Sequence, residues 1–258
     1  MWNRAELKTN AKQVLKNFYW KAVLACLIVG LLTGGLFSSA GSASSSAEDI
    51  IYSGSSGAYM GNAEDHAAFL AVFMVVFLVA LLVGLVLGLA YGAFVGGPME
   101  VGGKRYFMEN RSYPSSLKTV FFAFNCGKYG NVAKTMFLRN LYTSLWSLLL
   151  IVPGIIKSYE YYMIPYIMAE NPSISSERAF MLSKQMTQGR KMDLFIFDLS
   201  FFGWQLLGSL LFGIGIVFVN PYVEASGMEL YYWLRSDALY QGYSDPSELC
   251  DVQYPPMA

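Results

Sequence analysis

The sequence predicts an all-α protein of the polytopic membrane class, with about six transmembrane helices. Hydrophobic residues make up 55% of the 258 residues, and charged residues make up only 14%. A soluble domain has about 25% charged residues, because its surface must be hydrated. The chain also has 18 basic and 18 acidic residues. This balance excludes a basic nucleic-acid-binding protein, and the hydrophobic content excludes a disordered chain.

Six apolar segments are interpreted as membrane-spanning helices, because one crossing needs about 20 mostly apolar residues. The second segment has no charged residue and is longer than one crossing requires. The sixth is the weakest candidate, because two glutamates lie within it. The segments are residues 22–37, 67–97, 135–152, 155–169, 194–219 and 222–234.

Lysine and arginine alternate between the two sides of these segments, which predicts their orientation. Basic residues occur in residues 1–21, 98–134 and 170–193, and Arg235 follows the sixth segment. The connection 38–66 has no lysine or arginine and contains several acidic residues. Both termini are therefore expected to be cytoplasmic.

The basic N-terminal segment allows two interpretations. Lys8, Lys12 and Lys16 recur at four-residue spacing, opposite an apolar helical face. This pattern predicts an amphipathic helix on the inner leaflet, with its lysines bound to anionic lipid. The alternative is a secretory signal peptide that is cleaved after the small residues 38–40.

Residues 1–241 are expected to form a single membrane domain. Residues 38–66 are rich in serine, glycine and alanine and are interpreted as a flexible external loop. Residues 242–258 are expected to form a polar cytoplasmic tail. Segments 116–124 and 176–191 have helical apolar spacing like that of the N-terminal helix, so we hypothesise three helix-hairpin repeats. The alternative is that unrelated membrane hairpins share this pattern.

Small residues recur every four positions along the second predicted span, and Gly30 and Gly34 occupy a similar spacing in the first. Such a stripe allows two helices to approach closely in lipid. We expect the first two spans to pack on each other here, and a homodimer contact is the alternative. The glycines of the stripe are Gly84, Gly88, Gly92 and Gly96.

Six charged residues lie at predicted membrane depth, where a charge costs about 2.5–3.5 kcal/mol on insertion scales. Lys157 and Glu160 are three residues apart on one helix and are expected to pair. Arg139 is expected to pair with Glu229. Arg139 and Asp198 each lie about one turn inside a cytoplasmic boundary, so they either extend to that boundary or meet across the bundle. These charges form either structural ion pairs or a polar pocket on an ion or proton path. The set is Arg139, Lys157, Glu160, Asp198, Glu224 and Glu229.

Motifs for enzymatic chemistry fail on inspection. Residues 97–104 resemble a phosphate-binding loop, but Pro98 replaces its first glycine and Arg105 its final serine or threonine. One histidine and three cysteines are too few for a usual zinc site or a disulfide framework. We therefore expect no enzyme activity, no metal and no cofactor.

Several short motifs together resemble one bacterial family of integral membrane proteins, catalogued as domain of unknown function 975. They are PGIIKSY at 153–159, AENP at 169–172, GRK at 189–191, LSFFGW at 199–204 and NPY at 220–222. The resemblance implies a multi-pass protein of the bacterial inner membrane and assigns no activity. It supplies no catalytic residues.

These observations favour a non-enzymatic function, as a membrane-organising or accessory protein that binds lipid or another membrane protein. The basic surface helices and the lack of a catalytic constellation support this expectation. The alternative is a small transporter or exporter in which Arg139, Glu160, Asp198 and Glu229 line a path. No nucleic-acid partner is expected.

Overall fold

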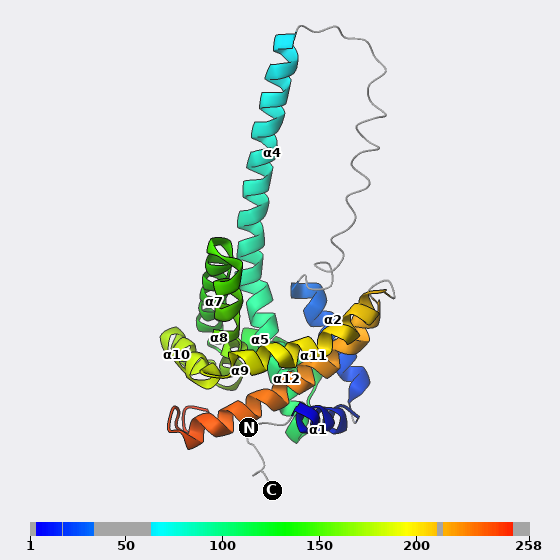
Figure 1. Cartoon of the computed structure of the whole chain (residues 1–258), viewed down its shortest axis with the longest axis vertical. Coiled ribbons are helices and arrows are strands. Elements are labelled where there is room, and N and C mark those ends of the chain that lie inside the picture. The colour runs from blue at the N-terminus through cyan, green and yellow to red at the C-terminus, as the bar shows by residue number, and fades with distance from the viewer. Residues whose placement is uncertain (1–3, 17, 34–62, 211–213, 250–258) are drawn as a thin grey trace.

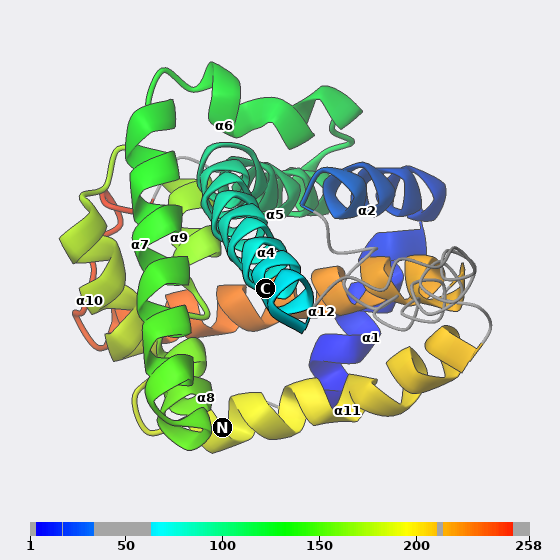
Figure 2. The same cartoon turned by 90° about the horizontal axis from the view of Figure 1, so that it is seen from above.

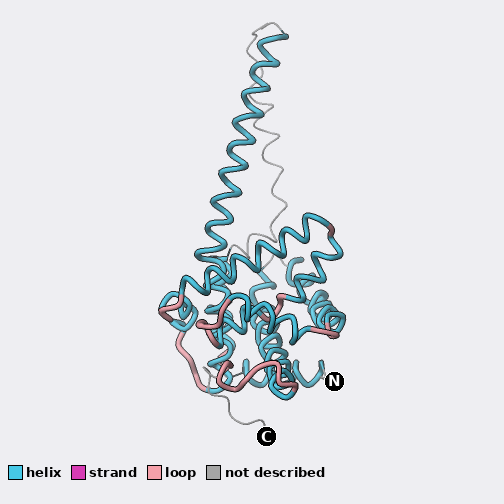
Figure 3. The backbone as a smooth tube through the Cα atoms, turned by 90° about the vertical axis from the view of Figure 1, so that its left-hand side faces the viewer, coloured by secondary structure: helices cyan, strands magenta, loops and turns pink. Residues whose placement is uncertain are grey.

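A computed structural model describes residues 4–16, 18–33, 63–210 and 214–249. These residues form helices joined by short turns, and none of them belongs to a β-strand (Figure 3). The predicted all-α class is therefore confirmed for this part of the chain. Within the same residues, no helix has both the length and the apolar character that a bilayer crossing demands.

The first hairpin contains the longest helix of the fold. Helix α1 (Arg4–Lys16) is followed by α2 (Tyr19–Thr33), and α4 (Ala63–Tyr91) extends far beyond the other helices (Figure 1). Helix α4 continues through a π-helical turn, η1 (Gly92–Gly96), into α5 (Gly97–Ser112). Pro98 lies in the first turn of α5, where a proline is tolerated, and the Gly97 N–H closes the π-helical turn on the Gly92 carbonyl oxygen.

The second hairpin follows two short helices, η2 (Leu117–Phe121) and α6 (Phe122–Asn125). Helix α7 (Tyr129–Leu149) ends at an extended residue, and α8 (Ile151–Glu160) then returns along it, followed by α9 (Ile164–Glu170). Gly154 allows the two helices to meet, because a Cβ at this position would lie 2.6 Å from Ser147 Cα.

The third hairpin follows helix α10 (Ser176–Thr187), whose first turn is capped by Ser175. Helix α11 (Lys191–Leu210) leads to the tip of the hairpin, and α12 (Ile214–Tyr240) returns from it. Gly208 and Gly215 meet here, since a Cβ on Gly215 would lie 2.6 Å from Gly208 Cα. A short helix, a break and a hairpin thus occur three times in this order, the arrangement that three similar units would have.

The core lies where the returning helices α5, α9 and α12 pack against one another, with α1 against α12 and α2 against α5 (Figure 2). Methionine, tyrosine and aliphatic side chains fill this region and are almost completely buried. The largest of them are Tyr106, Tyr231, Met99, Met108, Met163, Ile164, Ile167 and Met168.

Two of the predicted spans do not match single helices. The segment 194–219 crosses a hairpin tip, since α11 ends at Leu210 and α12 begins at Ile214. Residues on both sides of this tip are apolar, so hydropathy does not mark the turn. The segment 155–169 is divided between α8 and α9.

Two predicted terminal or connecting segments are partly described. Residues 63–66 of the expected external loop belong to α4, while the rest of that loop and the residues 38–40 of the signal-peptide alternative lie outside the described residues. In the expected polar tail, Leu249 is fully buried. Arg178 Nε also donates to Glu248 Oε1 at 2.6 Å, so the first residues of this tail pack against the fold.

Candidate functional site

The charged residues predicted at membrane depth belong to several separate interactions. Lys157 Nζ lies 3.0 Å from Glu160 Oε1, which confirms the predicted ion pair. Glu160 also accepts a hydrogen bond from Lys191 Nζ at 2.7 Å. Spacing along one helix revealed the first contact, whereas the second joins α8 to α11 and leaves no signal in the local sequence.

The predicted pairing of Arg139 with Glu229 is wrong. Arg139 NH1 lies 2.9 Å from Glu100 Oε2, and Glu229 Oε1 lies 2.9 Å from Arg111 Nε. Helix α5, which carries both Glu100 and Arg111, contacts α7 as well as α12. It therefore supplies the nearer partner to each residue, and Arg111 lies in this helix instead of the predicted connection 98–134.

Glu224 and Asp198 have partners that the sequence analysis did not name. Lys104 Nζ lies 2.6 Å from Glu224 Oε2 and 4.7 Å from the centre of the Tyr166 ring. Burial is the largest single effect on the pKa of Lys104 and lowers it, but the Glu224 carboxylate, together with Tyr166 and Glu100, raises it by more in sum, so the net pKa is raised. Asp198 does not meet the arginine of α7, and instead accepts a hydrogen bond from the Tyr162 hydroxyl at 3.3 Å.

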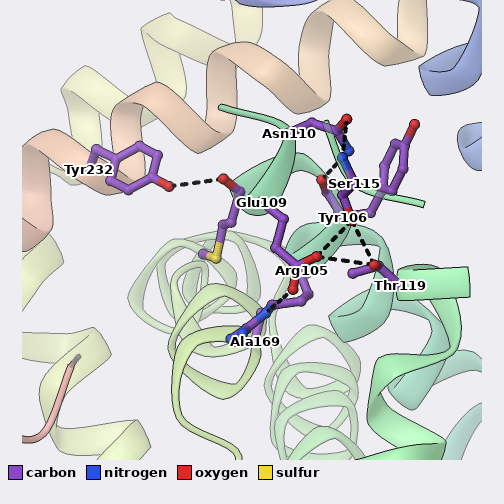
Figure 4. A network of polar contacts seen from close by, with 9 residues as sticks. Arg105, Tyr106, Glu109, Asn110, Ser115, Thr119, Ala169 and Tyr232 are labelled. Atoms are coloured by element: carbon purple, nitrogen blue, oxygen red, sulfur yellow. Dashed lines mark hydrogen bonds and ion pairs between the residues drawn. The ribbon is translucent and has the colours of Figure 1, made fainter. Parts of the chain in front are cut away.

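A network of hydrogen bonds connects α5 to η2 and α9 (Figure 4). Glu109 accepts hydrogen bonds from Arg105 Nε at 2.8 Å, Ser115 Oγ at 2.7 Å and Thr119 Oγ1 at 3.1 Å. Arg105 NH1 also donates to the Ala169 carbonyl oxygen at 3.0 Å. Every partner of this carboxylate is a group within the fold, so we assign the network a structural role.

The fully buried Glu170 joins α9 to α12 in a similar way. It accepts from Arg235 Nε at 2.8 Å and from the Tyr231 hydroxyl at 2.5 Å. Arg235 NH2 also donates to the Leu249 carbonyl oxygen. The AENP motif that carries the family resemblance therefore includes a buried structural carboxylate.

The glycine stripe of the second predicted span is open in the described part of the molecule. Helix α2 contacts η1 and α5, yet a Cβ placed on any glycine of the stripe would have no described atom within 4 Å. Among the described residues, the first two predicted spans therefore meet at η1, but without close packing on the glycines themselves. Gly30 lies in α2, and Gly34 lies outside the described residues. The open positions are Gly84, Gly88, Gly92 and Gly96.

Helix α1 is amphipathic as predicted, and its apolar face packs on the protein. Leu7, Ala11 and Leu15 are buried, and α1 packs chiefly against α12. Lys8 Nζ donates to Ser200 Oγ at 2.7 Å. Burial, and then the positive charges of Arg4 and Lys12, lower the pKa of Lys8.

An open groove lies beside α1 and is bordered by α2, α11 and α12. We call it the basic–aromatic groove; its volume is about 630 Å³. Its lining combines two lysines of α1 with aromatic side chains, and Lys12 Nζ lies 5.6 Å from the centre of the Tyr222 ring. Among the described residues no carboxylate pairs with Lys12 or Lys16. The lining residues are Lys12, Leu15, Lys16, Tyr19, Trp204, Phe218, Val219 and Tyr222.

Large apolar side chains are exposed along α4 and near the tips of the other hairpins. On α4 they include Val72, Val76 and Leu82, whose side chains are 63%, 61% and 65% exposed. Further examples are Leu145, Leu148, Leu149, Leu150 and Val152 on the second hairpin, and Leu199, Phe202, Trp204, Leu206 and Leu207 on the third.

Metal-binding chemistry has no candidate site in the described part of the chain. No group of three or more histidine, cysteine, aspartate or glutamate side chains is arranged there to hold an ion. The basic–aromatic groove is therefore the candidate site whose lining best suits a ligand, since it joins lysines that have no carboxylate partner among the described residues to apolar surface.

Comparison with known proteins gives one match. A family model described as "Protein of unknown function (DUF975)" matches residues 72–238. No curated protein and no solved structure matches the chain. The matched region contains α5, α9 and α12, whose packing forms the core, whereas α1 and its lysines lie before it.

Proposed function

This chain belongs to the DUF975 family, whose description names no activity, and we propose that it is a non-enzymatic accessory protein of the membrane that binds lipid. The family membership confirms the resemblance drawn from the sequence motifs. In this proposal the hairpin helices contact the hydrocarbon of the bacterial inner membrane, while α1 and α10 lie at its cytoplasmic face.

The observation that carries the proposal is the exposed apolar surface of α4. This helix has 29 residues, and at 1.5 Å per residue it is about 43 Å long. Its described side chains from Leu70 to Val83 are nearly all large, apolar and exposed. Soluble monomers rarely expose apolar patches larger than a few hundred Å². Contact with lipid hydrocarbon removes the cost of hydrating such a surface.

The distribution of charge supports one orientation. Helices α1 and α10, which carry basic residues, lie at the opposite end of the molecule from the free end of α4 (Figure 1). Cytoplasmic segments of membrane proteins are enriched in lysine and arginine. We therefore place both termini in the cytoplasm, with the tips of the hairpins directed into the bilayer.

The ion pairs support an accessory role more than transport. Glu160, Glu224 and Glu229 each face a lysine or arginine at 2.6–3.0 Å, and Arg139 faces Glu100. Paired charges hold helices together and are not free to bind a passing ion without breaking those contacts. A transport path through these residues is therefore the less favoured alternative.

The test is extraction of the full chain from bacterial membranes. We expect the protein to remain in the membrane after an alkaline carbonate wash and to be released by detergent. Replacing three exposed valines of α4 by aspartate adds charges that each cost about 2.5–3.5 kcal/mol at membrane depth, so this variant should be released by carbonate. The substituted residues are Val72, Val76 and Val79.

A matched control places the same three aspartates at exposed polar positions of the core region. These positions are Ser116, Asn125 and Ser173. The control variant should remain in the membrane like the unmodified protein. Release of the unmodified protein by carbonate would refute the proposal, as would equal retention of the α4 variant.

A further inference from the structure

The basic–aromatic groove combines two surfaces that a single amphiphile would bind. We propose that it holds one anionic phospholipid of the bilayer, with the phosphate at Lys12 and Lys16 and an acyl chain along Trp204 and Phe218. This inference rests on the proposed function, because it requires the chain to lie in a membrane. It names the class of lipid and the site that binds it.

The basic part of the groove is suited to a phosphate. Lys12 and Lys16 are exposed and one helical turn apart, and among the described residues neither ammonium group has a carboxylate within ion-pair distance. The other cations of α1 add to the positive field. The pKa of Lys8 is lowered by burial and then by the positive charges of Arg4 and Lys12. A bound phosphate would neutralise this field.

The aromatic part of the groove is suited to an acyl chain. Trp204 is 60% exposed and Phe218 is 43% exposed, although both are large apolar side chains. The Tyr19 hydroxyl donates to the Phe218 carbonyl oxygen at 3.2 Å. Trp20 packs edge-on against Phe218, with the centres of the two rings 6.4 Å apart. These contacts hold α2 against α12 and leave one face of the aromatic cluster open.

The position of the groove favours a lipid over a soluble anion or an acidic peptide. Helix α1 lies at the lower side of α11 and α12, which is the proposed cytoplasmic side of the molecule (Figure 1). The aromatic part continues into the exposed apolar surface of α11, which includes Leu206 and Leu207. A groove of about 630 Å³ has room for part of a lipid, and its open side leaves the remaining chain in the bilayer.

Native mass spectrometry of the full chain in detergent tests the proposal. The probes are phosphatidylglycerol and phosphatidylcholine with identical acyl chains, added in equal amounts. We expect one phosphatidylglycerol to bind in preference to phosphatidylcholine. Each surface lysine contributes about fivefold to the affinity for anionic lipid, so Lys12→Gln/Lys16→Gln should weaken this binding about thirtyfold. The exposed control pair Lys118→Gln/Lys134→Gln has the same net charge and should bind like the unmodified protein.

The apolar contact is tested separately with Phe218→Ala and with glycerol 3-phosphate. We expect the substitution to weaken phosphatidylglycerol binding, and we expect glycerol 3-phosphate, which lacks acyl chains, to compete poorly. Full competition by glycerol 3-phosphate would overturn the lipid assignment in favour of a soluble anion. Equal binding of both phospholipids, or equal losses in the two lysine pairs, would overturn the assigned headgroup site.

The remaining outcome is a groove that is filled by a segment of the chain itself. If the full chain bound no added lipid, while a variant without residues 38–60 bound it, the proposal would be overturned, because residues 38–60 and not a lipid would be the occupant of the groove. Failure of the proposed function is distinguished by the carbonate wash. A protein that stays in washed membranes but lacks this lipid preference retains the proposed function and loses only the groove assignment.

Discussion

Replacing Glu229 by glutamine is expected to destabilise the fold by about 3 kcal/mol. The Glu229 side chain is 4% exposed and its Oε1 lies 2.9 Å from Arg111 Nε, whose side chain is 21% exposed. Removing one partner of a buried ion pair costs about 3–5 kcal/mol. The partial exposure of Arg111, and its position 4.1 Å from the centre of the Tyr232 ring, place the cost at the lower end of this range.

Denaturant unfolding of the full chain in detergent, followed by circular dichroism, measures this cost. Replacing both Arg111 and Glu229 by methionine should restore most of the lost stability, because neither charge is then left without its partner. Glu248→Gln is a matched control in a more exposed pair and should cost about 1 kcal/mol or less. If Glu229→Gln destabilised equally with and without Arg111, the structural role of the pair would be refuted.

Two further predictions concern packing and pH. A methyl group at Gly102 would overlap the Val120 carbonyl oxygen, so Gly102→Ala should lower stability by about 1–3 kcal/mol. Gly130→Ala has open space and should raise stability by about 0.5–1 kcal/mol; equal melting temperatures for the two variants would contradict this. The hydrogen bond from Arg178 holds the pKa of Glu248 below its usual value. Its stabilisation is therefore present above the unfolded pKa, about 4.3, and is lost as the pH falls through the folded pKa. Amide hydrogen exchange in residues 243–249, corrected for the intrinsic pH dependence, should lose protection as the pH falls through the lowered pKa of Glu248, and Glu248→Gln should remove this step.

Helix positions were largely predictable, because continuous apolar sequence and helical periodicity are local properties. The helices α2, α4 and α7 coincide in position with three predicted apolar segments. The tip between α11 and α12 was missed because its flanks are as apolar as the helices themselves. Apolar periodicity also predicted α1 correctly as an amphipathic helix, but it cannot distinguish a face buried on α12 from one buried in lipid.

Ion pairs were predictable only within one helix. The spacing of Lys157 and Glu160 specifies a contact of one helical turn, whereas the partners of Glu229 and Arg139 depend on how three helices pack. The same limit applies to the basic–aromatic groove. Its lysines stand out by their spacing in α1, but most of its aromatic lining, Trp204, Phe218 and Tyr222, comes from helices that are distant in the sequence.

The most direct test of the proposed membrane contact is a depth measurement at Val76, which is 61% exposed on α4. An environment-sensitive fluorophore is attached to Val76→Cys in the full chain, with the native cysteines replaced by serine, and the protein is reconstituted in bilayers. We predict quenching by brominated acyl chains and protection from aqueous iodide, with the opposite pattern for the same label at the exposed Lys184 of α10. Quenching of the Val76 label by iodide, without quenching by brominated lipid, would contradict the account.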